Sequence, residues 1–273
     1  MRGMKPYLAI FSARFRMMLQ YRAAAIAGLW TQIFFGMVMI MTYEAFYHST
    51  HQPEPMSFAQ LASYVWLGQA FLALLPWNAD LEVTAMVRSG AVAYELCRPI
   101  DLYNLWFMRA MAWRTAPTVL RVVPMTLLAM FGLPLIGLGA WRLHPPTPAG
   151  GAAFAGAMIC AVLLSSAITT LLNIILIWTI SANGPVVMLI ALVTLFSGMV
   201  IPLPLFPDWS QPILMALPFA GLVDLPYRIY VGKIAPGGVP DVMLRQLLWT
   251  AALVLLGRWL LKRGMRRVVV QGG

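Results

Sequence analysis

Six long apolar segments, joined by shorter polar connections, constrain this chain more than any other feature of its sequence. They cover residues 23–46, 58–77, 117–140, 151–178, 185–201 and 242–261. A helix needs about 20 mostly apolar residues to cross the hydrocarbon core of a bilayer, because each residue adds about 1.5 Å. Only 10% of the residues are charged, whereas soluble domains carry about 25%. We therefore predict an all-α integral membrane protein with six transmembrane helices.

The segment 202–241 differs in character from the six apolar segments. It is rich in proline and aromatic residues but only weakly polar, whereas a solvated linker would be more polar. We predict short extracellular re-entrant helices, broken at the prolines, because irregular backbone at membrane depth is tolerated where it packs on protein or lines a water-filled space. The fifth apolar segment is short, and we expect it to continue into this stretch.

Lysines and arginines gather on one side of the predicted membrane, in a ratio of 15 to 4. Cytoplasmic loops carry the excess of these residues, so we predict that both termini are cytoplasmic and that the chain is a multi-pass protein of a bacterial cytoplasmic membrane. The 15 residues are Arg2, Lys5, Arg14, Arg16, Arg22, Arg88, Arg98, Arg109, Arg114, Arg121, Arg258, Lys262, Arg263, Arg266 and Arg267. They flank apolar segments instead of forming a water-facing patch, so the net charge of +10 does not predict a nucleic-acid partner.

Residues 1–22 combine cations with an apolar stripe. Leu8, Phe11, Phe15, Met18 and Leu19 fall on one side of a helical wheel, with Lys5, Ser12, Arg16 and Gln20 roughly opposite. This pattern predicts an amphipathic helix in the membrane interface, with its cations toward anionic headgroups. The alternative is a frayed basic leader.

Motifs for nucleotide hydrolysis and metal binding are missing from the sequence. A phosphate-binding loop follows the pattern G-x-x-x-x-G-K-[ST], and Gly232-Lys233 lacks both the first glycine and the hydroxyl residue. His48 and His51 are three residues apart without an obvious third ligand, and His144 is isolated beside two prolines. We therefore predict no catalytic residues, no metal and no cofactor bound by this chain.

A few polar residues interrupt the apolar segments. Gln32, Gln69 and Asn173 either line a substrate pathway or form hydrogen bonds between helices. Arg121 lies near the predicted end of a span, where its side chain can extend toward the interface. Charged groups are otherwise scarce at membrane depth, which argues against a proton-driven pump.

The connection after the second apolar segment carries several helix signals. Asp80 is suited to cap a short helix over 81–88, and Gly90 to end it. Asp101 is suited to cap a second helix over 102–115. We therefore predict a cytoplasmic region, residues 80–105, that is built from short helices.

Apolar residues alternate with small and polar ones between these two helices. Val92, Tyr94 and Leu96 are predicted to form an exposed apolar knob. Such a knob on a cytoplasmic loop is typical of a surface that enters a groove of a partner protein. The alternative is a loop that packs on its own membrane domain.

The same region resembles a known family, the membrane-spanning permease subunits of type-2 ABC exporters. That family has an arginine, then a glycine, then a proline nine residues later, and this chain has Arg88, Gly90 and Pro99 with Leu96 and Ile100 nearby. Residues 94–103 are similar to a less characterised subgroup whose permeases occur in pairs. Family members often carry an acidic residue three positions after the glycine, whereas this chain has Ala93 and, two residues later, Glu95.

A second region carries the same resemblance. Residues 197–202, 207–209 and 217–218, followed by Asp224, are similar to the end of the family's fifth span and to the re-entrant helices before its last span. The resemblance implies one type-2 ABC transmembrane domain over 1–273. In this domain 1–22 is the connecting helix, and the coupling helix lies within 81–100.

The resemblance also implies partners. A second permease, identical or related, would complete the substrate pathway, and cytoplasmic ATP-binding-cassette ATPase subunits would bind ATP and Mg. The implied docking residues are Arg88, Gly90, Tyr94, Glu95, Leu96, Arg98 and Pro99. Two other classes stay open: a stand-alone membrane enzyme, which would need clustered carboxylates or histidines, and an ATP-independent carrier.

Overall fold

The computed structural model describes residues 4–20, 22–49, 54–179 and 183–265. In this part of the chain every regular element is helical, which confirms the predicted all-α class. The α-helices are α1 (Lys5–Met18), α2 (Arg22–Ser49), α3 (Phe58–Phe71), α4 (Leu81–Ser89), α5 (Val92–Leu96), α6 (Leu102–Leu127), α7 (Leu133–Leu135), α8 (Pro148–Thr179), α9 (Asn183–Phe196), α10 (Gln211–Ala216), α11 (Asp224–Tyr230) and α12 (Val239–Gly264).

Four helical stretches in the described ranges are long and apolar enough to cross a membrane. They are Ala25–Ser49, Leu102–Leu135, Pro148–Thr179 and Pro236–Gly264. A fifth is added if Asp208–Ala216 and Pro218–Tyr230, which meet at 77°, form one broken span. The predicted second and fifth spans are represented by the shorter apolar helices Phe58–Leu74 and Gly184–Phe196. The chain is therefore a multi-pass membrane protein with four or five spans by length, where the sequence predicted six.

The predicted break between a helix over 102–115 and a span over 117–140 is wrong. One helical stretch runs through both, from Leu102 to Leu135, with Pro117 and Pro124 inside it and a π turn at Leu128–Gly132. Threonine hydroxyls and local π turns help an intramembrane helix to accommodate proline. Here Thr118 Oγ1 donates to the carbonyl of Arg114 across 2.6 Å.

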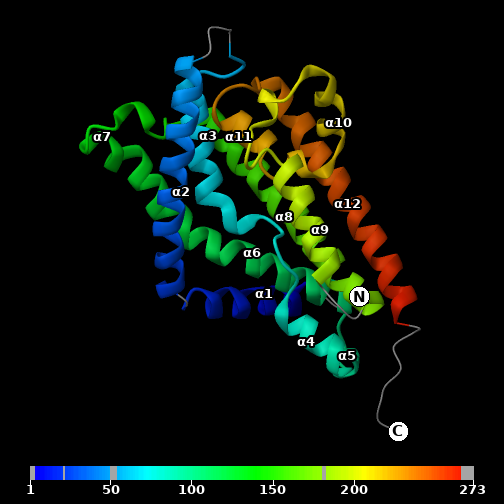
Figure 1. The fold of residues 1–273 in the computed structure, drawn as a ribbon. Helices are drawn as coiled ribbons and strands as arrows, with labels where there is room; N and C mark the ends of the chain where they lie inside the picture. Colours follow the sequence, from blue (N-terminus) through cyan, green and yellow to red (C-terminus); the bar gives the residue numbers. More distant parts are fainter. Residues whose placement is uncertain (1–3, 21, 50–53, 180–182, 266–273) are drawn as a thin grey trace.

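Helix α8 lies at the centre of the bundle, with α6, α9 and α12 around it (Figure 1). Its middle is lined by small polar residues, Ser165, Ser166, Thr169 and Thr170, all of which are buried. Their hydroxyls are satisfied by helix carbonyls, as in the 2.7 Å bond from Thr170 Oγ1 to Ser166. Small residues let helices approach closely in a membrane, which explains why this helix can occupy the centre.

Helix α2 crosses α3 at Gly36 and is otherwise open on its outer side. A Cβ atom at Gly36 would lie 2.9 Å from the Trp66 ring, so only glycine allows this approach. The outer side of α2 exposes large apolar side chains. They include Ile26, Trp30, Phe34, Phe35, Val38 and Met41.

The short helices predicted within 202–241 are present. α10 and α11 flank the 3-10 turn Pro218–Gly221, and the two arms of this segment meet at the 77° bend. Their re-entry into the membrane remains a prediction. They lie at one end of the bundle, and α1, α4 and α5 lie at the other (Figure 1).

The elements that were predicted to be cytoplasmic share one end of the molecule. α1 lies across the bundle there, beside α4, α5 and the end of α12 (Figure 1). Arg258 of α12 donates to Asn104 Oδ1 across 2.6 Å and lies 3.6 Å from the Asp101 carboxylate. Arg2, Arg266 and Arg267 from the charge count lie outside the described residues, as does His51.

Candidate functional site

The loop between α3 and α6 forms a folded elbow, residues 80–101, and its caps are the predicted ones. The Asp80 carboxylate accepts the N–H groups of Glu82 and Val83 across 2.9 and 3.3 Å, and so begins α4. Gly90 ends α4 with φ +74°, a left-handed conformation that favours glycine. Asp101 caps α6 by accepting a backbone N–H across 2.9 Å.

A single buried arginine of α6 connects the parts of the elbow. The Arg109 guanidinium donates to Glu95 Oε1 across 3.0 Å and to Glu82 Oε2 across 2.7 Å, and lies 3.4 Å from Asp80. Only 6% of its side chain is exposed. Because the three carboxylates belong to α5, α4 and the α4 cap, this one side chain fixes α4 and α5 against α6. The sequence placed Arg109 in the predicted cytoplasmic helix over 102–115, and its burial was not predicted.

Helix α1 is fastened to the same elbow. Arg14 donates two hydrogen bonds to the Glu82 carboxylate, one of them across 2.7 Å. These bonds hold the pKa of Glu82 below its usual range, against the opposing effect of its partial burial. The Tyr7 hydroxyl also accepts the backbone N–H of Asp101 across 3.0 Å. The predicted amphipathic helix is therefore observed over Lys5–Met18 and is joined to the elbow by an ion pair.

The outer surface of the elbow is only partly the predicted one. Tyr94 is 79% exposed and Leu96 is 47% exposed, so both project from α5. Val92 was predicted to be exposed but is buried, because α5 is helical and turns it inward with Glu95. Glu95 also accepts a hydrogen bond from Trp106 Nε1 across 2.7 Å. Among the other predicted docking residues, the exposed ones are Arg88, Arg98 and Pro99, while Gly90 is half-buried.

Two of the three predicted pathway residues come together. In the amide orientation that satisfies both of its groups, Gln32 donates to the backbone carbonyl of Gln69 across 3.0 Å and accepts from Arg121 Nη1 across 3.1 Å. Both glutamines line a hollow of about 380 Å³ between α2 and α3. Asn173 lies elsewhere, where its Oδ1 accepts the backbone N–H of Asp80 across 2.9 Å. Asn173 therefore supports the elbow.

A buried carboxylate that sequence reasoning did not single out as a site fastens the far end of the bundle. Asp224 of α11 has no exposed surface, and its Oδ1 lies 3.1 Å from the Tyr64 hydroxyl and 3.3 Å from the Leu203 nitrogen. Its Oδ2 lies 3.3 Å from Arg228. The Tyr64 hydroxyl also bonds to the Gly198 carbonyl across 3.0 Å. These contacts join α3, α11 and the turn after α9.

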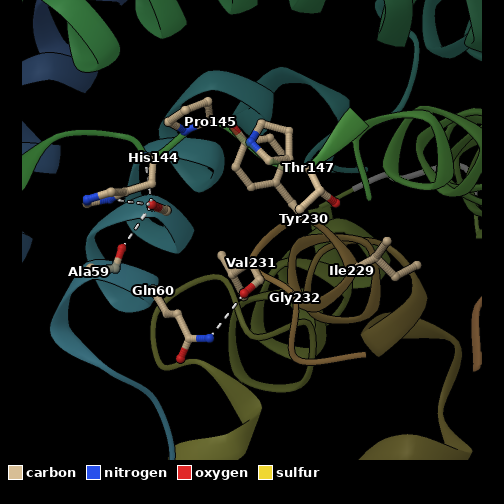
Figure 2. A pocket seen from close by; sticks show the side chains of 11 residues that line it. Ala59, Gln60, His144, Pro145, Thr147, Ile229, Tyr230, Val231 and Gly232 are labelled. Carbon is tan, nitrogen blue, oxygen red and sulfur yellow. Dashed lines mark hydrogen bonds between the residues drawn. The ribbon is translucent and has the colours of Figure 1, made fainter. Parts of the chain in front are cut away.

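Figure 2 shows a pocket of about 220 Å³ at that end, lined by residues of α3, of α11 and of the segment before α8. His144 lies at its edge, and burial together with the charge of Arg142 holds the pKa of His144 below its usual range. Ser63 Oγ is 3.5 Å from the imidazole, but its proton goes to the Ala59 carbonyl across 2.9 Å. No carboxylate in the described ranges bonds to His144, so the pair lacks the arrangement of an activated nucleophile.

Metal ligands are not gathered anywhere in the described part of the chain, where no group of three His, Cys, Asp or Glu side chains could hold an ion. Polar side chains gather instead at the elbow, at the hollow beside Gln32 and at the pocket at the far end. A further hollow of about 320 Å³ lies beside the elbow and is lined by Arg14, Glu82 and Arg109 among others.

Comparison with known proteins agrees with these features. Residues 24–272 match the family described as ABC-2 family transporter protein, a range that includes every described helix from α3 to α12 and most of α2. No curated protein and no solved structure matches the chain. Because the match extends over nearly the whole sequence, the chain belongs to the ABC-2 transporter family and is an ABC transporter permease.

Proposed function

We propose that this chain is the membrane-spanning subunit of an ATP-driven exporter, and that its elbow docks on separate cytoplasmic ATP-binding-cassette ATPase subunits. The observation that carries the proposal is the exposed Tyr94 and Leu96 on a helix held rigidly by Arg109. An exposed aromatic residue beside an aliphatic one is a typical anchor of a protein interface. ATP and Mg would be bound by the ATPase subunits.

The proposed coupling follows the connections of the elbow. A displacement of α5 would be transmitted through Glu95 to Arg109, and so to α6, which is helical from Leu102 to Leu135. Such a helix is about 50 Å long, at 1.5 Å per residue. The bonds from Arg14 to Glu82 would carry the same displacement to α1. Closure of the ATPases would thus move two membrane-embedded helices together.

The proposed orientation of the chain in the membrane is based on α1, the elbow and the end of α12, which lie at the same end of the bundle (Figure 1). These elements contain eight of the 19 lysines and arginines, whereas α10 and α11 contain only Arg228, and we place these three in the cytoplasm by the positive-inside rule. The same rule places α10 and α11 on the extracellular side, in a bacterial cytoplasmic membrane.

A second permease, identical or related, would complete the transporter. The outer face of α2 supports this proposal, because Trp30, Phe34 and Phe35 are all more than half exposed. Part of this face would contact lipid, and the remainder would contact the second permease across the substrate pathway. The hollow beside Gln32 and Gln69 would then open toward that pathway.

The docking surface is tested by replacing both anchors with charges. Tyr94→Asp combined with Leu96→Asp is expected to abolish copurification of the ATPase subunits and to reduce transport at least tenfold, while the permease itself still folds. Tyr94→Phe combined with Leu96→Met is the matched control, because it keeps the apolar area and should assemble normally. ATPase assembly and transport that survive the double Asp variant would overturn the docking proposal.

A further inference from the structure

Arg121 of α6 carries a positive charge within a stretch that is otherwise apolar. All nine acidic residues of the chain lie in the described ranges, and none forms an ion pair with it. Two other arginines of α6 are buried: Arg109 has three carboxylates around it, and Arg114 donates to two backbone carbonyls and a threonine hydroxyl. Arg121 has neither arrangement, since its one hydrogen bond within the described residues goes to the Gln32 amide, and an anion from outside this chain would offset the cost of its charge.

The Arg121 guanidinium is held in place against α2. A Cβ atom at Gly28 would lie 2.7 Å from Nη2, so the absence of a side chain there makes room for the charge. Nη1 donates to the Gln32 amide across 3.1 Å. Nε is buried and has no hydrogen-bond partner. The guanidinium is therefore placed against α2 while its buried Nε–H has no acceptor in the described part of the chain.

This charge lies beside the hollow of about 380 Å³, because Gly28 and Gln32 belong to both. The rest of the hollow is mostly apolar. Its other lining residues are Thr31, Phe35, Met39, Gln69, Leu72 and Met199. A cationic and amide-bearing end next to an apolar wall suits a molecule that has one charged and one apolar part.

The height of the site agrees with a ligand that comes from the membrane. Gly28 is six residues beyond the first residue of α2, which corresponds to about 9 Å along the helix. Interfacial helices such as α1 lie about 5–10 Å deep in the headgroup region. Arg121 therefore lies within about two helical turns of the α1 end of α2, where its guanidinium can meet the head of an amphiphile that enters from the interface.

We propose that Arg121 and Gln32 bind the anionic head of an amphiphile, a phosphate or carboxylate, whose apolar part lies against the hollow. Guanidinium matches the geometry of both anions and pairs with them through two parallel hydrogen bonds. That this amphiphile is the exported molecule rests on the function proposed above. The binding site itself does not.

Binding is tested with the purified chain in phosphatidylcholine nanodiscs, without ATPase subunits. Spin-labelled phosphatidylglycerol and spin-labelled phosphatidylcholine are the probes, and their relative association with the protein is measured. The wild type is expected to prefer the anionic lipid, and Arg121→Gln to lose that preference about tenfold, equivalent to about 1.4 kcal/mol. Arg121→Lys should retain part of it. Lys233→Gln is the charge-matched control, since Lys233 is exposed in the turn that follows α11 and belongs neither to α1 nor to the hollow.

Two further variants show whether a lost lipid preference comes from the site itself and not from unfolding of the chain. Gly28→Leu should displace the guanidinium, and Gln32→Leu should remove its amide partner, and both leave the arginine present. Each is expected to weaken the anionic preference several-fold. Equal preference for the two lipids in the wild type, or an unchanged preference in every variant that folds, would overturn the site.

The source of the amphiphile is decided in the assembled transporter. If the anionic amphiphile is exported, Arg121→Gln should reduce its ATP-dependent movement across the membrane while ATPase copurification through Tyr94 stays intact. Normal movement in the variant, together with lost binding in nanodiscs, would identify a resident lipid and overturn the assignment as cargo. If ATPase subunits do not copurify with the wild-type chain, the proposed function fails, and the binding site in nanodiscs is not affected by that result.

Discussion

The guanidinium of Arg109 donates to the carboxylate of Glu95 across 3.0 Å, and both side chains are buried. This bond fixes α5, which has only five residues, against the much longer α6. Trp106 donates to the other oxygen of the same carboxylate across 2.7 Å. Because buried ion pairs are costly to break by removing one partner, the direction in which Tyr94 points depends on Glu95.

Replacing Glu95 with Gln should therefore loosen α5 locally. We expect a loss of about 1–3 kcal/mol, the usual contribution of a hydrogen bond to a charged group together with the unpaired atom left behind. Hydrogen exchange of residues 90–100 should accelerate while that of α8 stays constant. Asp208→Asn is the control, because Asp208 is exposed and forms no ion pair in the described part of the chain. Equal exchange in the two variants would contradict this role.

The attachment of α1 to α4 through Arg14 and Glu82 should weaken at acid pH. Bonding to Arg14 lowers the pKa of Glu82 from its usual 4.5, so the ion pair stabilises the fold fully above about pH 4.5 and loses this effect as the pH falls through the lowered pKa. Glu82 is 56% exposed, and solvent screening keeps the effect small. Spin labels on α1 and α4 should separate below pH 4.5 in the wild type. In Glu82→Gln the separation should be independent of pH over this range.

Two glycines with similar backbone conformation should respond differently to alanine. Gly198 and Gly232 have φ of +84° and +76°, and a Cβ atom in this region costs about 1–2 kcal/mol. A Cβ at Gly198 would also lie 2.5 Å from the Tyr64 hydroxyl and 3.1 Å from Asp224, whereas at Gly232 it would meet nothing within 4 Å. In thermal unfolding, the free energy of unfolding of Gly198→Ala should therefore be lower than that of Gly232→Ala by about 1–3 kcal/mol, which is the cost of overpacking. Equal midpoints of thermal unfolding for the two variants would show that the close contacts at Gly198 do not affect stability.

The parts of the elbow that could be predicted are those that depend on local geometry. Asp80, Gly90 and Asp101 act within three residues of their own positions, so their roles are visible in the sequence. The exposure of Tyr94 and Leu96 was predicted from a different signal, the alternation of apolar with small and polar residues. Val92 was assigned wrongly because the alternating pattern placed it in the same exposed knob as Tyr94 and Leu96, whereas one short helical turn places Val92 and Glu95 on the same inward face.

What could not be predicted depends on contacts between distant residues. The predicted helix over 102–115 ended before Pro117, whereas α6 continues through this proline while packed against α1, α3 and α8. Once α6 continues, Arg109 and Arg114 fall inside the protein, and their acceptors lie 14 or more positions away in sequence. The pairing of Gln32 with Arg121 is of the same kind.

Arg114 is a buried arginine that binds backbone carbonyls distant from it in sequence. Only 3% of it is exposed, and the segment it contacts is the non-helical backbone between α3 and α4. Nη1 donates to the Leu75 carbonyl across 2.7 Å, Nη2 to the Asn78 carbonyl across 3.0 Å, and Nε to Thr169 Oγ1 across 3.1 Å. Irregular backbone inside a membrane protein requires such partners, so Arg114 satisfies the carbonyls that the break in the helix leaves open.

Replacing Arg114 with Leu should accordingly destabilise the protein more than a usual surface change. The carbonyls of Leu75 and Asn78 would lose their charged donor, each at about 1–3 kcal/mol, so we expect a total loss of about 2–6 kcal/mol. Arg114→Lys keeps one charged donor and should fall between the wild type and the Leu variant in thermal unfolding. Hydrogen exchange in residues 75–80 should rise in the same order. A Leu variant as stable as the wild type would show that the break is supported by packing alone.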